Sequence, residues 1–434
     1  PQRADVVALQ RDQWFAGVLD ELGGYDPDPA WLAAWAAHLA PYSSLSHSCR
    51  LLSAAIDLGG AAGDEVLDIL RESALGRHAV GVMGMHVVRS LLECGRREAW
   101  TFIEGMLLAA QRQEGLRQWI LEGAMTAHPG AFRLLLGTIA EHDLVRFAAV
   151  VRAIDVWFGF AWDSMSTGHA SKIVERVIGF LDHPETRAGA IEGDDAETAY
   201  LALWCTAHED AQAATAAAAG LLRNASAEKR WVGIHTLGRL RLPMPPEAVL
   251  LALADDDLRV AARAVDAMRL EAGVGGGADP GEDGLDEVGE TDAIRVALFD
   301  RLVTLMNRIP GKKQTFKPLV FPWGRSALAA ADVGRVLVGA CPGDRVDQLI
   351  AVIDRLDVYA RSEAARQIGG STNSWDPPPK GKPKKLTPVA RATLIALLGD
   401  PAQDVRAMAA ARLEREPLAD DEAARHEALL DRAA

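Results

Sequence analysis

Residues 394–413 read LIALLGDPAQDVRAMAAARL. The apolar first half ends at Gly399-Asp400-Pro401, and a second amphipathic stretch begins directly after it. Glycine and proline interrupt a helix, and an Asp in such a turn can cap the helix that follows. The segment therefore predicts two short helices joined by a tight turn.

Related units recur earlier, near residues 221–238 and 349–369. The first of these places Asn224, Glu228, Arg230 and Leu237 where the quoted segment has Asp400, Asp404, Arg406 and Leu413. The second keeps Arg361 and Ile368 at the same spacing of seven residues. Stacked helix pairs form long surfaces that usually bind rather than catalyse. We therefore predict an all-α chain, folded as an α-solenoid of antiparallel helix pairs.

Composition agrees with this fold class and restricts the function. Apolar residues make up 49% of the chain, and they recur at three- and four-residue spacing, as in Trp100, Ile103 and Leu107. The net charge of −14 argues against a general attraction to nucleic acid or to an anionic membrane. Charges interrupt the apolar stretches before they reach the length of a membrane span. The four cysteines are far apart and no secretory signal is recognisable, so we expect a cytoplasmic protein.

One segment divides the chain. Residues 273–292 contain seven Gly and seven acidic residues, and neither Lys nor Arg. Such a stretch buries too little apolar surface to offset its ordering entropy, which predicts a flexible linker. It separates an acidic helical array, residues 1–272 with net charge −12, from residues 293–434, whose net charge is +5.

Two insertions, residues 309–323 and 371–388, are the strongest indication of a binding site. They hold seven of the nine lysines of the chain, and each has a Trp and several Pro. The candidate binding residues are Lys312, Lys313, Lys317, Trp323, Trp375, Lys380, Lys382, Lys384 and Lys385. Clustered ammonium groups with a nearby Trp suit phosphates and stacked bases. The same loops could instead contact a protein or acidic peptide, or could be solvated linkers.

Two other stretches combine charge with aromatic residues. Residues 146–163 end in four aromatic side chains, and Arg152 and Asp155 are spaced to pair on one helix face. This pattern fits either an aromatic pocket with a carboxylate or a core helix with a surface ion pair. Residues 112–119, with Arg96-Arg97-Glu98 before them, fit either a carboxylate-binding Arg site or pairing between neighbouring helices.

Motifs of catalysis and metal binding are not recognisable. The eleven His have no spacing typical of metal ligands, and neither a phosphate-binding loop nor a nucleophile elbow occurs. We therefore predict no cofactor and no metal site, and we favour a non-enzymatic protein.

The repeated helix pairs resemble HEAT and armadillo repeats, on the strength of residues 400–413 and their weaker copies. In HEAT repeats the Arg after the turn commonly bonds within and between repeats, which implies a structural role for Arg230, Arg361 and Arg406. Residues 109–118, 128–132 and 146–157 also resemble a group of large bacterial helical-repeat proteins. Some of that group are described as molybdate-metabolism regulators and carry a WGR domain.

These resemblances leave two functions open. The first is a bacterial interaction scaffold that binds a protein partner through its helical-repeat surface. The alternative is nucleic-acid binding through the Lys loops, with base recognition similar to that of HEAT-like DNA glycosylases at the aromatic stretch. The literal Trp323-Gly324-Arg325 does not predict a WGR domain, because that domain is rich in strands and helix-forming residues follow here.

Overall fold

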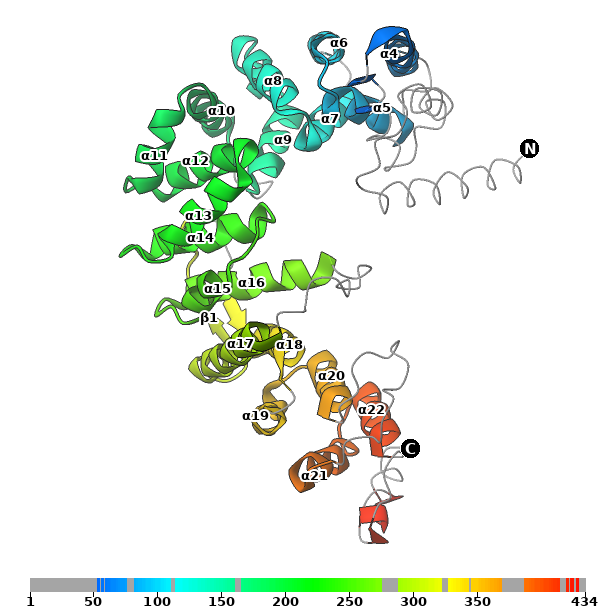
Figure 1. The fold of residues 1–434 in the computed structure, drawn as a ribbon, viewed down its shortest axis with the longest axis vertical. Helices are drawn as coiled ribbons and strands as arrows, with labels where there is room; N and C mark the ends of the chain where they lie inside the picture. The colour runs from blue at the N-terminus through cyan, green and yellow to red at the C-terminus, as the bar shows by residue number, and fades with distance from the viewer. Residues whose placement is uncertain are drawn as a thin grey trace, which may run out of the picture. The chain divides into compact units, whose positions relative to one another are not determined.

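The computed structural model describes residues 53–75 without 55 and 58, then 82–110, 114–160, 165–274, 288–321, 327–342, 345–368, 386–413 and part of 419–428. The described residues form an all-α helical-repeat fold, as the sequence predicts (Figure 1). The chain divides into two compact units, Pro1–Gly189 and Ala190–Ala434.

The first unit alternates helices between two layers. One layer holds α4, α6, α8 and α10, and the other holds α5, α7 and α9 (Figure 1). The bounds are α4 Gly60–Leu75, α5 Val82–Glu93, α6 Arg97–Ala109, α7 Glu114–Gly123, α8 Pro129–Glu141, α9 Ala148–Phe158 and α10 Thr167–Asp182. Two short 3₁₀ turns, η2 at Ala124–Thr126 and η3 at Leu144–Arg146, complete it. In one layer α6 packs on α8 and α8 on α10, and in the other α5 packs on α7 and α7 on α9, so the core is a continuous seam of apolar side chains.

The second unit continues the same alternation. The helices α12, α14, α16, α18, α20 and α22 contact one another in succession, and α13, α15, α17, α19 and α21 pack beside them. The bounds are α12 Ala196–Glu209, α13 Ala211–Leu221, α14 Ala227–Arg239, α15 Pro246–Leu253, α16 Leu258–Val274, α17 Val288–Arg308, α18 Ala330–Ala340, α19 Val346–Ala351, α20 Val358–Ile368, α21 Pro388–Leu397 and α22 Gln403–Leu413. A 3₁₀ turn, η5, spans Ile353–Arg355, and a further helix, α11 Pro184–Glu192, lies at the junction of the two units along the chain.

Side-chain caps explain where several helices begin. Ser166, Asp195, Asp210, Ser226 and Thr387 each accept a hydrogen bond from the backbone N–H three residues later. Each bond satisfies one of the N–H groups that the first turn of a helix leaves unpaired. These side chains therefore determine where α10, α12, α13, α14 and α21 begin.

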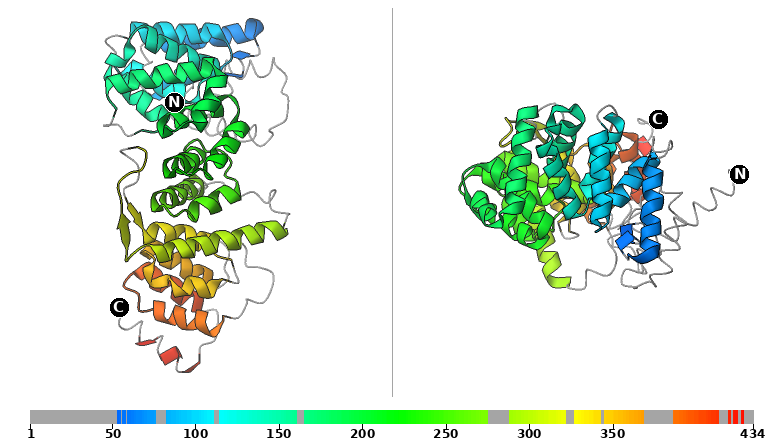
Figure 2. Two further views of the ribbon diagram at one scale, coloured as in Figure 1. Left: turned by 90° about the vertical axis from the view of Figure 1, so that its left-hand side faces the viewer. Right: turned by 90° about the horizontal axis from the view of Figure 1, so that it is seen from above.

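A pair of short strands departs from the prediction. β1, Lys313–Thr315, lies in the predicted loop 309–323 and pairs antiparallel with β2, Ala327–Ala329. β2 lies in the stretch after Trp323-Gly324-Arg325 that the sequence presents as helix-forming, so α18 begins only at Ala330. Ala and Leu favour helix locally, but pairing with a distant segment determines their conformation here. In the left-hand view of Figure 2 the two yellow strands lie at the edge of the helices of their unit.

The predicted linker lies within the second unit. Residues 275–287 are outside the described part of the chain, so the flexibility of 273–292 stays a prediction. The helices on its two sides belong together, since α15 contacts α17 and α16 contacts α18. Among the described residues, no helix combines the length and the apolar character that crossing a membrane requires.

Candidate functional site

The aromatic stretch 146–163 forms a core helix over its described part. Asp155, Trp157 and Phe158 of α9 are buried, and the Trp157 indole donates to the Leu121 carbonyl at 2.8 Å. Arg152 is exposed, so it does not share the environment of Asp155. Residues 161–164 lie outside the described residues. The described geometry therefore corresponds to a core helix, and the surface ion pair expected between Arg152 and Asp155 is wrong because Asp155 is buried.

Pairing between neighbouring helices accounts for two of the arginines in the second polar stretch. The Arg117 side chain is buried over the ring of Phe147, 3.8 Å from its centroid, and donates to the Ala110 carbonyl at 2.6 Å. Arg96 donates to the Asp64 carboxylate of α4 at 2.6 Å. Both guanidinium groups are engaged within the fold, whereas Arg97 beside them is exposed.

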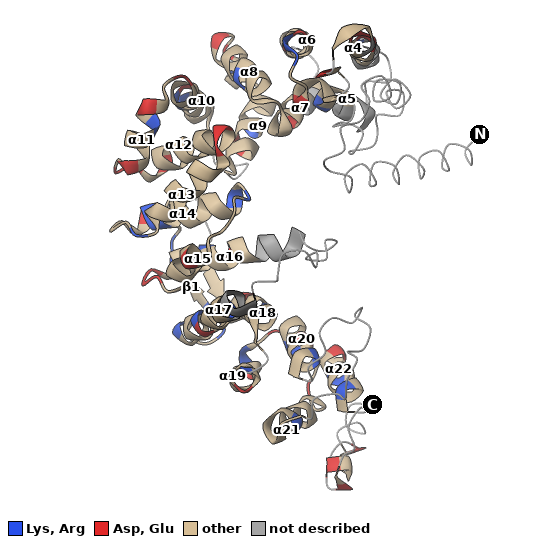
Figure 3. Cartoon of the chain, viewed as in Figure 1, with Lys and Arg blue, Asp and Glu red and all other residues tan. Residues whose placement is uncertain are grey.

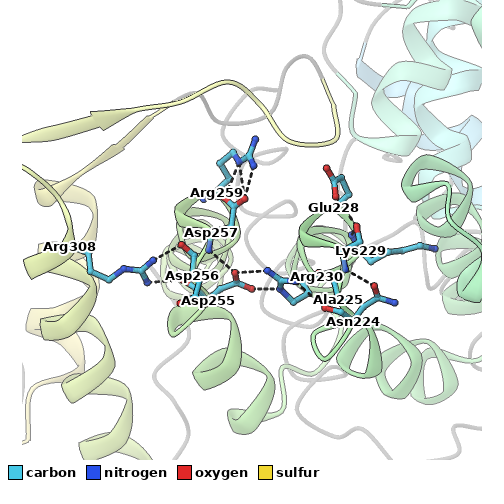
Figure 4. Close-up of polar contacts among 11 residues, drawn as sticks. Asn224, Ala225, Glu228, Lys229, Arg230, Asp255, Asp256, Asp257, Arg259 and Arg308 are labelled. Carbon is cyan, nitrogen blue, oxygen red and sulfur yellow. Dashed lines mark hydrogen bonds and ion pairs between the residues drawn. The ribbon is translucent and has the colours of Figure 1, made fainter.

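The Arg that follows each repeat turn has the structural role that HEAT-like resemblance implies. Arg230 of α14 donates to the carbonyls of Asn224 and Ala225 in its own turn, and to both carboxylate oxygens of Asp255 in the next turn (Figure 4). The Asp255 side chain is only 5% exposed, so the guanidinium supplies the charge that this carboxylate needs. Arg230 therefore links two consecutive repeats.

The unit near residues 349–369 repeats this arrangement. Arg361 of α20 donates to the Leu356 carbonyl of its own turn and to the carboxylate of Asp400 in the next turn. Arg406 of α22 donates to the carbonyls of Asp400 and Pro401. The guanidinium groups of these arginines are used in hydrogen bonds within and between repeats, so we do not count them as candidate binding residues.

Arg230 and Arg406 each stand six residues after the first residue of their turn, Asn224 and Asp400, but the turn at Asp255 has no Arg at that spacing. Six residues after Asp255 stands Ala261, which is fully buried. Arg308, at the end of α17, donates instead to the carbonyls of Asp255 and Asp256, at 2.6 and 2.8 Å (Figure 4). The same pair of turn carbonyls is thus bonded by a side chain from another helix, which sequence spacing alone does not reveal.

The structure describes three of the nine predicted binding residues. Lys312, Lys313 and Lys317 are exposed, on β1 and directly beside it. Trp323 lies outside the described residues, as do Trp375, Lys380, Lys382, Lys384 and Lys385. The binding role of these residues therefore stays a prediction.

An aromatic cluster that sequence reasoning missed holds the end of the Lys-bearing segment. Phe321 meets the rings of Tyr200, Trp231 and His235 edge to face, with centroids 5.5 to 5.8 Å apart. Trp231 and His235 are stacked at 4.4 Å. These residues come from α12, α14 and the segment after β1, so only the fold brings them together.

Two open grooves flank α6 on one layer of the first unit. The groove between α4 and α6 has a volume of about 470 Å³, and that between α6 and α8 about 370 Å³. Arg97 lines both grooves. The second is also lined by Trp100, Glu104, Arg133 and Glu141. Both signs of charge are present on α8 (Figure 3).

The Trp100 indole is held rigidly at the second groove. Its Nε1 donates to the Cys94 carbonyl at 2.7 Å, and its ring stacks on His128 at 4.9 Å. Gly130 makes room for this ring, because a Cβ at that position would lie 2.5 Å from it. The half-buried Trp100 is therefore preorganised rather than free to rotate.

Within the described ranges, no group of three or more His, Cys, Asp or Glu could hold a metal ion. The fold and these surfaces define an all-α helical-repeat protein. Residues 39–433 match the family model described as a family of unknown function (DUF5724), and the chain belongs to that family. Comparisons with curated proteins and with solved structures find no match. The resemblance to molybdate-metabolism regulators stays a prediction.

Proposed function

We propose that this protein is a non-enzymatic scaffold of the bacterial cytoplasm, and that a segment of a partner protein binds in the grooves beside α6. The observation that carries the proposal is the position of Arg97, an exposed cation shared by two adjacent open grooves. Among the described residues, its side chain has no ion-pair or hydrogen-bond partner. A guanidinium in that position can bind a carboxylate with two parallel hydrogen bonds.

Rigid Trp and exposed Arg side chains favour a protein ligand. These two residue types dominate the binding energy of many protein interfaces, especially where they are preorganised. The rigid Trp100 and the neighbouring Leu134 offer apolar surface, while Glu104 and Glu141 supply acceptors along the same groove. We therefore expect the bound segment to carry a carboxylate opposite Arg97 and an apolar side chain beside Trp100.

The test uses two substitutions that alter the grooves and spare the core. Arg97→Glu reverses the exposed charge. Gly137→Gln fills the second groove, which Gly137 lines, and a Cβ at that position meets nothing within 4 Å. Gly105→Gln on α6 is the matched control, because its Cβ site is equally open but Gly105 lines neither groove. Both glutamines replace a helix-interior glycine and should raise stability by about 0.5–1 kcal/mol.

Each tagged variant is purified from its native host after nuclease treatment, and the proteins that co-purify are identified. We expect the wild type and Gly105→Gln to retain the same partner, and Arg97→Glu and Gly137→Gln to lose it. Retention of every partner by all variants would exclude the grooves as the binding site. A wild type that retains no protein after nuclease treatment would contradict the scaffold itself.

A further inference from the structure

We infer that the open edge of β1 accepts an extended acidic segment of a partner protein as an additional strand. This surface lies in the second unit and is independent of the grooves beside α6. The inference rests on the backbone pairing of β1, on the charge around it, and on the contacts that hold it in place.

The register shows which backbone groups of β1 face away from β2. Lys313 lies opposite Ala329, and the Ala330 N–H donates to the Lys312 carbonyl at 3.0 Å. In an antiparallel pair this bond makes Lys313 and Ala329 a non-hydrogen-bonded pair, and Gln314 and Leu328 the bonded pair beside it. The N–H and C=O groups of Lys313 and Thr315 therefore point to the open edge.

These outward groups are available to a ligand. β1 and β2 form a two-stranded sheet, so no third described strand covers β1. Among the described residues, the N–H groups of Lys313 and Thr315 have no backbone acceptor. The Thr315 carbonyl accepts a 3.2 Å bond from the half-buried Gln314 side chain, which a bound strand would displace. An edge strand whose outward N–H and C=O groups are unpaired is a template for the addition of another strand.

Charge identifies the occupant as acidic. Residues 309–321 contain three Lys and no Asp or Glu, within a chain of net charge −14. All three ammonium groups are exposed beside the open edge. Lysine on an edge strand opposes pairing with a second basic strand, and it favours a strand that carries carboxylates.

The strand is presented on a fixed base. β2 packs on α16 and α18, and Phe321 anchors the other end of the segment among Tyr200, Trp231 and His235. Because both ends are held, binding an added strand costs little ordering of the protein. The alternating outward N–H and C=O groups match a peptide backbone, whereas a nucleic acid would use the lysines alone.

The probe is a fluorescein-labelled decapeptide of alternating Glu and Thr, titrated against the full chain by fluorescence anisotropy. Its matched control has the same sequence with an N-methyl group on every residue, which keeps the charge but removes the backbone donors of both edges. Strand addition predicts that N-methylation weakens binding by about tenfold or more, since the peptide can no longer donate to the outward carbonyls of Lys313 and Thr315. Replacing Lys312, Lys313 and Lys317 together by Glu should abolish binding.

One substitution tests the backbone of β1 itself. Thr315→Pro removes an outward N–H, at an edge position where proline is tolerated because that group does not bond within the sheet. Thr315→Ala removes the same side chain and keeps the N–H. We expect the proline variant to bind the peptide at least about tenfold more weakly than the alanine variant, with equal thermal stability.

Three results would overturn the inference. Equal binding of the methylated and unmethylated peptides would leave charge attraction alone, without strand addition. A short thymidine oligonucleotide that binds more tightly than the peptide, and equally to both Thr315 variants, would assign the lysines to nucleic acid. No peptide binding up to ~1 mM would remove the site. Arg97→Glu and Gly137→Gln should bind the peptide normally, so the groove proposal and this one can fail separately.

Discussion

His235 is surrounded by groups that favour its neutral form. Its Nδ1 accepts a 2.9 Å bond from the Arg263 guanidinium, and its ring is buried against Trp231. Burial, and then the positive charges of Arg263 and Arg239, lower the pKa of His235 well below its usual value. The same burial raises the pKa of the neighbouring Tyr200 to about 12. The cluster that anchors Phe321 is therefore uncharged apart from its arginines.

This environment predicts a loss of stability in mild acid. The unfolded chain protonates His235 near pH 6.5, whereas the folded chain does not, so below that pH the unfolded state binds the additional proton. The free energy of unfolding should then fall as the pH drops from 7 to 5, with a contribution of at most about 1.4 kcal/mol per pH unit. His235→Gln, whose amide oxygen can still accept from Arg263, should flatten this slope.

Urea unfolding of the wild type and the variant at several pH values checks the prediction. His183→Gln is the control, because the His183 side chain is 65% exposed. The lowered pKa values of Asp257 and Glu228 affect stability only at lower pH, so they do not obscure this window. Identical slopes for the wild type and His235→Gln would show that His235 is not the group responsible.

At the scale of helices, one side chain from α17 bonds the backbone carbonyls of the turn at Asp255 and Asp256. Arg308→Met removes two hydrogen bonds from a guanidinium to turn carbonyls, which should lower the free energy of unfolding by about 1–3 kcal/mol. Arg301→Met on the same helix is the control, since Arg301 is exposed and has no described partner. Chemical denaturation of both variants measures the difference, and equal stability would mean that water replaces Arg308 without cost.

How well the sequence predicts an element depends on whether its signals are local. The two helices predicted within residues 394–413 are the end of α21, Pro388–Leu397, and α22, Gln403–Leu413. The segment of α11 has little amphipathic pattern, and we did not predict it. β2 was mistaken for helix because its partner is a segment that the sequence presents as a loop.

For the candidate sites too, the sequence predicts what depends on local spacing and not what depends on packing between distant segments. The resemblance to HEAT repeats implied a structural role for Arg230 and Arg361, and each donates to a carbonyl of its own turn. Arg308 substitutes for a missing Arg from 52 residues away along the chain, and no local motif marks it. The groove shared by Arg97 and Trp100 exists only once α6 and α8 pack together. The sequence did identify Lys312, Lys313 and Lys317 as exposed, but it could not show that they lie along a strand edge.

For the whole chain, the Gly-rich acidic segment raises the question of whether it separates two bodies. The helices on either side of residues 273–292 pack together, and Arg308 bonds the turn at Asp255 and Asp256 across that gap in the sequence. A chain cut within this segment should therefore stay associated, because the apolar contacts of α15 with α17 and of α16 with α18 do not depend on the covalent connection.

A specific protease site inserted after Ala278 tests this expectation. After cleavage, both fragments should elute together in size-exclusion chromatography under native conditions, and should separate in concentrated urea, which confirms that cleavage is complete. Fragments that separate without denaturant would mean that residues 1–272 and 293–434 behave as two domains joined by a linker. Co-elution would instead make the acidic segment an insertion within the helical repeats of the second unit.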